Sequence, residues 1–278
     1  MPATPREMPM PETDWSRLKA HELRALAAQD AVVILPIASI EQHGPHLPTM
    51  TDTRLGYEIA MRAARKARDT RPVVVTPVVW SGLSEHHMPY GGTLTLSQST
   101  FRAVIRDLVE AITRHGFRHI LISNSHGGNQ IAMQQICDEL APTSAATLVA
   151  TTYVTEAGDD LARHCQDQPG VMHAGEAETS MMMVCEPDLV DTSDLGNLTQ
   201  AMDGARFLKA GKASYRWRPF QHVTANGIVG NPTRASAAKG EAMLEAGAEA
   251  VAALIRDPET WAPVLDVRGE GTQGVPFR

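Results

Sequence analysis

Four apolar runs with little polar alternation mark the first part of the chain, at 31–37, 73–80, 119–124 and 146–154. Each run has the length of a strand and is apolar on both of its faces. Strands of this kind are typical of a parallel sheet that is covered on both sides. We therefore predict four strands at these positions.

Segments with helical spacing separate and follow these runs. In the clearest one, which begins at Ser97 and ends at His115-Gly116, Phe101, Ile105 and Ile112 fall on one face. Helices are also predicted at 15–28, 53–68, 130–140, 176–184 and 236–255. Alternating strands and helices predict a three-layer α/β/α sandwich with a mostly parallel central sheet, in which chemistry lies at the carboxyl ends of the strands.

The rest of the chain shows weaker patterns. Residues 1–14 are interrupted by prolines and predict an N-terminal arm, 188–230 is loop-rich, and 258–278 predicts a C-terminal tail. We expect a single domain over 1–278; its hydrophobic content of 43% is ample for a core. Length alone does not decide between one domain and two.

Charge and cysteine content narrow the possible functions. The net charge of -7 argues against electrostatic binding of nucleic acid. Three widely spaced cysteines without a CxxC pair argue against a disulfide framework and against a cysteine-based zinc site. No apolar run approaches about 18 residues, and the N-terminus lacks the apolar core of a signal peptide. We therefore predict a cytoplasmic protein that binds neither nucleic acid nor membrane.

Candidate metal ligands follow the first apolar run. Glu41 and His43 are two positions apart, so in extended backbone both side chains project to one side. Asp52 can return to them across the Gly44-Pro45 turn. These oxygen and nitrogen donors suit zinc, manganese or a similar ion, and a carboxylate can bridge two ions. Taken alone, Asp52 could equally be the N-cap of the following helix.

Two further segments carry the same kinds of side chain. His126 follows the third run and precedes Gly127 and Gly128, which allow a sharp turn and a close approach of substrate or ion. A phosphate-binding loop is the alternative, but the sequence lacks GxGxxG and a Walker-type lysine.

The third segment opens a helix with His173, Glu176 and Glu178. Glu176 could complement the helix dipole, whereas Glu178 precedes an apolar run and is expected to point inward. An inward carboxylate needs a partner, and a metal ion is the natural one. Each of these residues also has an ordinary structural explanation, as a cap, a surface carboxylate or a hydrogen-bonded histidine. Their coincidence at three strand or helix ends favours a metal site.

The segments together resemble the creatininase (creatinine amidohydrolase) family. The resemblance rests on EQHGPHLP at 41–48 with Asp52, NSHGGN at 124–129 and HAGEAETS at 173–180, supported by SEHHMPYGGTL at 84–94 and GIVGNP at 227–232. These motifs agree with the family in order and in their placement on the predicted elements, over about residues 15–257. The HGGN form resembles branches other than creatinine hydrolase itself.

The resemblance implies a creatininase-like fold, frequently a homohexamer, and a centre of two divalent ions such as zinc, manganese or iron. By motif position, one metal would be bound by Glu41 and His126, the other by His43 and Glu178, and Asp52 would bridge them. His173 would be the catalytic acid or base.

The same resemblance implies hydrolysis of a C-N amide bond by a hydroxide that bridges the two ions. Creatinine hydrolase has a glutamate where this chain has Gly128 and another where it has Met172, and this chain has no tryptophan between Trp80 and Trp217. We therefore expect a small cyclic amide, a formamide or a peptide-like substrate other than creatinine.

Substrate contacts are expected from Glu85, His87, Gly127 and Gly128, although Glu85 and His87 could instead form a polar surface turn or a subunit interface. Two other functions stay open. The same centre could hydrolyse a lactone or another ester, or the chain could be a catalytically silent metal-binding scaffold.

Overall fold

A four-stranded parallel sheet forms the centre of the protein. The computed structural model describes residues 12–198 and 216–268. The strands are β1 (Val32–Ile37), β2 (Val73–Val75), β3 (His119–Asn124) and β4 (Thr147–Thr152), in the order β2-β1-β3-β4. In register, Val32 pairs with Val73 on one side and His119 on the other. All four strands therefore end at the same edge of the sheet.

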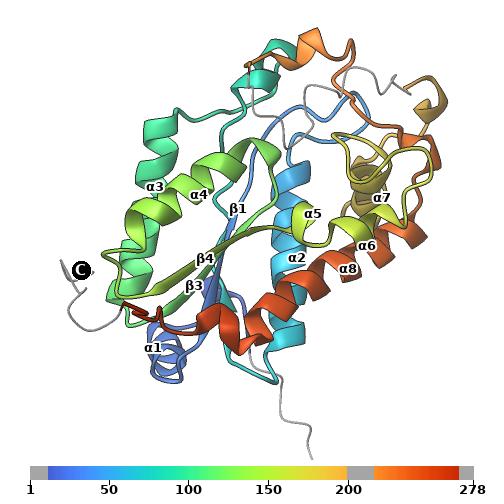
Figure 1. Cartoon of the computed structure of the whole chain (residues 1–278). Helices are drawn as coiled ribbons and strands as arrows, with labels where there is room; N and C mark the ends of the chain where they lie inside the picture. The colour runs from blue at the N-terminus through green and yellow to red at the C-terminus, as the bar shows by residue number, and fades with distance from the viewer. Residues whose placement is uncertain (1–11, 199–215, 269–278) are drawn as a thin grey trace, which may run out of the picture.

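Helices cover both faces of this sheet, as Figure 1 shows. Successive β1 side chains alternate between two cores: Val32 and Ile34 join one, and Val33 and Leu35 join the other. Because both faces are buried, the strand is apolar throughout. The first core is closed by α2 (Thr51–Ala67), α7 (Glu176–Cys185) and α8 (Ala237–Arg256), and the second by α1 (Ala20–Ala28), α3 (Gln98–Arg114) and α4 (Gln130–Leu140). The predicted three-layer α/β/α sandwich is confirmed.

Two predicted elements differ in detail from the structure, and two short helices were not predicted. The helix expected at 15–28 is divided into a 3-10 turn, Trp15–Arg17, and α1. The strand expected at 73–80 ends at Val75, and only a single bridge at Val79 continues the pairing. Pro77 explains this early end, because proline has no backbone donor for the ladder. Two short helices, α5 (Tyr153–Glu156) and α6 (Gly158–Ala162), follow β4 directly.

The predicted arm, loop-rich region and tail are only partly within the described residues, since 1–11, 199–215 and 269–278 lie outside them. Within the described part of 188–230, short 3-10 turns replace longer elements, as at Phe220–His222. The tail begins with another turn, Pro258–Trp261, whose Trp261 is buried. In the chain as described, no helix is both long enough and apolar enough to cross a membrane.

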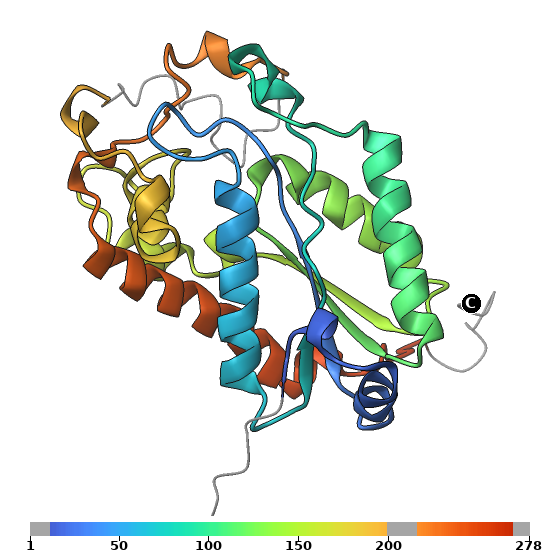
Figure 2. The ribbon, with the colours of Figure 1, turned by 180° about the vertical axis from the view of Figure 1, so that it is seen from behind.

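Long connections gather beyond the carboxyl edge of the sheet. Figure 2 shows the segment after β1, the segment before α3 and the segment that leads into α8 on this side of the molecule. The turn Glu85–Tyr90 contacts the turn Phe220–His222 there, although about 130 residues separate them in the chain. The candidate metal ligands predicted from the sequence lie close together at this edge.

Candidate metal centre

Glu41 is the most connected carboxylate at the carboxyl edge. It lies four residues beyond β1 and is 1% exposed. Its Oε2 accepts a hydrogen bond from the Ser84 hydroxyl at 2.6 Å and lies 3.1 Å from Nδ1 of His126. Its Oε1 lies 3.2 Å from Nε2 of His87 and 3.6 Å from Nδ1 of His173. Glu41 thus has buried polar neighbours on both of its oxygens.

Asp52 connects the two imidazoles that the sequence places in different segments. Its Oδ1 lies 3.4 Å from Nε2 of His43, and its Oδ2 lies 3.0 Å from Nδ1 of His126. The N-cap alternative for Asp52 is wrong, because Met50 occupies the N-cap of α2 and Asp52 lies inside the first turn. Placed there, the carboxylate is buried and directed at both histidines.

Glu178 approaches the same cluster from α7. Its Oε2 lies 3.7 Å from Nε2 of His43 and accepts a hydrogen bond from the backbone N–H of Ala174 at 2.6 Å. Ala174 has a φ of 54°, in the left-handed region, which is uncommon for a residue with a side chain. The turn between His173 and α7 is therefore held in an unusual conformation that directs this N–H at Glu178.

Glu176 lies in the first turn of α7 and makes a buried ion pair. It is fully buried and forms an ion pair with Lys239 of α8, and its Oε2 accepts a hydrogen bond from the backbone N–H of Gln166 at 2.9 Å. A buried carboxylate paired in this way joins α7 to α8. It is therefore an internal ion-pair partner, and its place in the first turn of α7 still allows it to complement the helix dipole.

Backbone carbonyls fix which nitrogen of each histidine faces the carboxylates. A carbonyl only accepts, so Nδ1 of His43 donates to the Glu41 carbonyl at 3.1 Å, and Nε2 of His126 lies 3.2 Å from the Leu83 carbonyl. The opposite nitrogens, Nε2 of His43 and Nδ1 of His126, then direct lone pairs at carboxylate oxygens. Nε2 of His43 and Oδ2 of Asp52 are buried without a hydrogen-bond partner among the described residues.

This arrangement requires positive charge. Burial opposes protonation of His43, but Asp52, Glu178 and Glu41 outweigh it and raise the pKa of His43 to about 9. Burial likewise opposes protonation of His126, and the charges of Glu41 and Asp52 still raise its pKa well above the ordinary value. Burial raises the pKa of Glu178 to about 7. A divalent cation would supply the same positive charge and accept the orphaned lone pairs.

The cluster contains three groups of residues that could each hold a metal ion. Within each group, the donor atoms lie within 4.8 Å of one another. The groups are Glu41 with Asp52 and His126, His43 with Asp52 and Glu178, and Glu41 with His43 and His173. All five candidate ligands predicted from the sequence are therefore brought together. Their donor chemistry and the orphaned atoms fit divalent metal.

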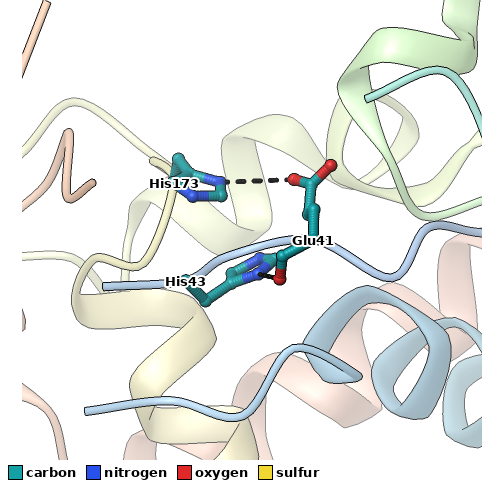
Figure 3. Close-up of side chains that lie close together, drawn as sticks. All are labelled: Glu41, His43 and His173. Atoms are coloured by element: carbon teal, nitrogen blue, oxygen red, sulfur yellow. Dashed lines mark hydrogen bonds and ion pairs between the residues drawn. The ribbon is translucent and has the colours of Figure 1, made fainter. Parts of the chain in front are cut away.

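His173 stands beside this cluster. Figure 3 shows the His173 ring directed at the Glu41 carboxylate, with His43 on the same stretch of chain as Glu41. Its Nε2 donates to the Gln42 carbonyl at 2.9 Å, and its ring centre is 4.3 Å from that of His43. Burial, followed by the charge of His43, lowers the pKa of His173 well below its usual value. The ring is neutral, and its Nδ1 carries the free lone pair.

The candidate substrate-binding residues lie in contrasting places. His87 is 1% exposed and covered by Phe220, whose ring centre is 4.1 Å away, while Glu85 is exposed. Gly127 is open, but a Cβ on Gly128 would lie 2.3 Å from Nε2 of His126. Gly128 therefore has no room for a glutamate in this conformation, and the carboxylate of Glu178 lies near His43 instead. Substrate contacts by these four residues stay a prediction.

Sequence reasoning missed three residues that contact the cluster: Ser84, Gln42 and Phe220. Ser84 directly precedes the Glu85-His86-His87 stretch, so its neighbours were a usable signal. Gln42 lies between two candidate ligands and was overlooked because alternation places it on the opposite side. Phe220 lies in the loop-rich region, where no pattern indicates which residue reaches the site.

Comparisons with known proteins agree with the fold and with the use of divalent metal. The creatininase family model, described as creatinine amidohydrolase, matches residues 16–255. A mycofactocin precursor peptide peptidase of Mycolicibacterium smegmatis is 30% identical over 222 residues, which cover 78% of this chain and 81% of that protein. A solved Mn creatininase and a mutant creatininase of the Zn-Zn type are each 25% identical, with a TM-score of 0.72, and cover 91% of this chain and 100% of their own.

These findings define a metal-dependent hydrolase that acts on C-N bonds and uses divalent metal. The match extends over most of the chain and includes every motif of the candidate centre. The chain belongs to the creatininase family.

Proposed function

We propose that the chain hydrolyses a C-N amide bond with two divalent ions held by the five clustered residues. One ion would be bound by Glu41 and His126, the other by His43 and Glu178, with Asp52 between them. The observation that carries this proposal is the orientation of the two imidazoles, because each has one nitrogen tied to a backbone carbonyl and the other directed at carboxylates. Zinc and manganese suit this mixed oxygen and nitrogen donor set.

The chain's own residues supply the remaining parts of an amide hydrolysis. When bound, the ions would lower the pKa of water and polarise the substrate carbonyl. His173 lies at the edge of the cluster, where its Nδ1 would accept the proton that the attacking water loses and pass it to the departing amine. Phe220 is 4% exposed and packs edge-on against His173 at 4.9 Å, so it keeps bulk water from this face of the ring.

The substrate is expected to be peptide-like, or a small cyclic amide or formamide. Support for a peptide-like substrate comes from the similar mycofactocin precursor peptide peptidase. Creatinine is not expected, since the aromatic side chain at His173 is Phe220 and Gly128 leaves no space for the carboxylate of creatinine hydrolase. Peptides, formamides, cyclic amides and lactones should therefore be compared in one assay.

Metal analysis and one matched pair of variants test this proposal. Purified protein loaded with zinc or manganese should hold two ions per chain and cleave at least one amide. Glu178→Gln should lose one ion and the activity, because an amide is a much weaker ligand than a carboxylate. Glu110→Gln makes the same chemical change on the exposed face of α3 and should alter neither.

Three results would contradict the proposal. The first is a native protein that binds no metal, and the second is a Glu178→Gln variant with full metal content. The third is cleavage of lactones or other esters without any cleavage of amides, which would replace amide hydrolysis by the ester alternative.

A further inference from the structure

Gln42 lies between Glu41 and His43 in the chain but makes its own set of contacts. Its side-chain Oε1 accepts a hydrogen bond from the backbone N–H of Gly44 at 2.9 Å, and its Nε2 donates to the carbonyl of Gly227 at 3.2 Å. A backbone N–H can only donate and a carbonyl can only accept. These two partners therefore fix the orientation of the Gln42 amide independently of any histidine.

The oriented amide determines the tautomer of His87. Nε2 of Gln42 lies 2.8 Å from Nδ1 of His87, and because the amide nitrogen only donates, Nδ1 is the acceptor. In the neutral ring the hydrogen is then on Nε2, which lies 3.2 Å from Oε1 of Glu41. His87 consequently donates a hydrogen bond to Glu41, and its one lone pair, on Nδ1, is already engaged by Gln42.

The backbone of the same residue determines the tautomer of His173. The Gln42 carbonyl accepts from Nε2 of His173 at 2.9 Å, which leaves the lone pair on Nδ1, 3.6 Å from Oε1 of Glu41. The Gln42 amide nitrogen also lies 3.1 Å from Nε2 of His173, but both atoms carry hydrogen, so this contact is not a hydrogen bond. Two imidazoles that flank Glu41 are thus held in defined states by one residue.

Phe220 limits the alternatives available to both rings. Its ring centre lies 4.1 Å from that of His87 and 4.9 Å from that of His173, and those two imidazoles are 4.4 Å apart. Gln42 itself is 7% exposed. Water has little access to replace the Gln42 contacts, so their loss would leave buried groups unpaired.

We propose that Gln42 is a positioning residue: its side-chain amide makes His87 a hydrogen-bond donor to Glu41, and its carbonyl makes Nδ1 the free nitrogen of His173. The inference rests on the proposed metal centre, because its consequence is a correctly oriented Glu41 ligand. Partners that orient a metal ligand typically contribute about 10–100-fold to metal affinity, so loss of the Gln42 contacts should weaken metal binding by that factor.

The first test compares Gln42→Leu with Gln135→Leu, a change on the exposed face of α4. Zinc affinity is measured by competition with a chelator, and the imidazole nitrogens of zinc-loaded, isotopically labelled protein are examined by NMR. Native protein and Gln135→Leu should show His87 protonated on Nε2 only. Gln42→Leu should lose this signature and bind zinc about 10–100-fold more weakly.

A second pair of variants tests the donor directly and does not alter Gln42. His87→Gln keeps an N–H group that can reach Glu41, whereas His87→Phe fills the space without a donor. We expect His87→Gln to stay close to native zinc affinity and His87→Phe to fall about 10–100-fold below it.

The outcomes separate this inference from the proposed function. If the native protein binds no zinc, the proposed function fails and this inference fails with it. If the native protein binds zinc but His87→Phe binds it as tightly as His87→Gln, or if His87 is protonated on Nδ1, only the inference is overturned.

Discussion

Replacing Gly240 with alanine is expected to disturb the contact between α7 and α8. A Cβ at Gly240 would lie 1.9 Å from the backbone oxygen of Ser180, so one helix must move by at least about 1 Å. Overpacking of this kind costs roughly 1–3 kcal/mol, and the upper part of that range, about 2–3 kcal/mol, applies here because the obstacle is backbone that cannot rotate away. Alanine recovers about 1 kcal/mol of helix propensity. We expect unfolding free energy to fall by about 1–2 kcal/mol, or the melting temperature by roughly 2–8 °C.

Gly247 provides the matched control in the same helix. A Cβ there would meet the end of the Ile59 side chain at 2.8 Å, and a flexible side chain can rotate away. Gly247→Ala is therefore expected to melt within about 2 °C of the native protein. Both variants should be melted with zinc at saturation and again after chelation, since Ser180 is two residues from Glu178 and Gly240→Ala should also weaken zinc binding. A Gly240→Ala variant as stable as Gly247→Ala would refute the reasoning.

Three further results are expected. Lys239→Met should lower the free energy of unfolding in urea by about 3 kcal/mol, because the buried Glu176 loses its cation, and adding Glu176→Gln should restore part of the loss; an unchanged stability would contradict this. Burial raises the pKa of Cys137 and of Cys185 to about 11 and also raises that of Cys165. Iodoacetamide should therefore alkylate the folded protein slowly at pH 8 and faster toward pH 11. Rapid labelling at pH 8, seen by mass spectrometry, would contradict the burial of these thiols. Because Trp80 and Leu94 are more than half exposed, light scattering should show a homo-oligomer. The family resemblance leads us to expect a hexamer. A monomer at micromolar concentration would contradict this prediction.

The layer structure could be predicted because burial on both faces leaves a direct trace in the sequence. β1 is apolar throughout, β3 is apolar at its centre, and α3 keeps its apolar face at helical spacing from the Ser97 cap onward. Strand order could not be obtained in this way, since every strand of a covered parallel sheet has the same apolar pattern. The early end of β2 was missed because the run stays apolar past Val75, although Pro77 was a visible signal.

The candidate ligands could be found because they lie near the ends of predicted elements, in segments that also contain glycines such as Gly44, Gly127 and Gly175. The sequence favours Glu178 over Glu176 as the inward carboxylate, because an apolar run follows Glu178, but it could not show what either carboxylate contacts. The difference lies in their partners: Lys239 of α8 pairs with Glu176, and His43 is close to Glu178. Partners that distant in the chain leave no local pattern.

The side chain that covers the site belongs to a different part of the chain from those that form it. Phe220 comes from the connection that leads into α8, whereas the carboxylates and imidazoles come from the ends of β1 and β3 and from α2 and α7. Sequence change in that connection can therefore alter which molecules are admitted while the reactive core stays intact. Such a division of labour would let one chemistry diversify over many substrates, and it makes the residues around Phe220 the natural place to begin redesigning selectivity.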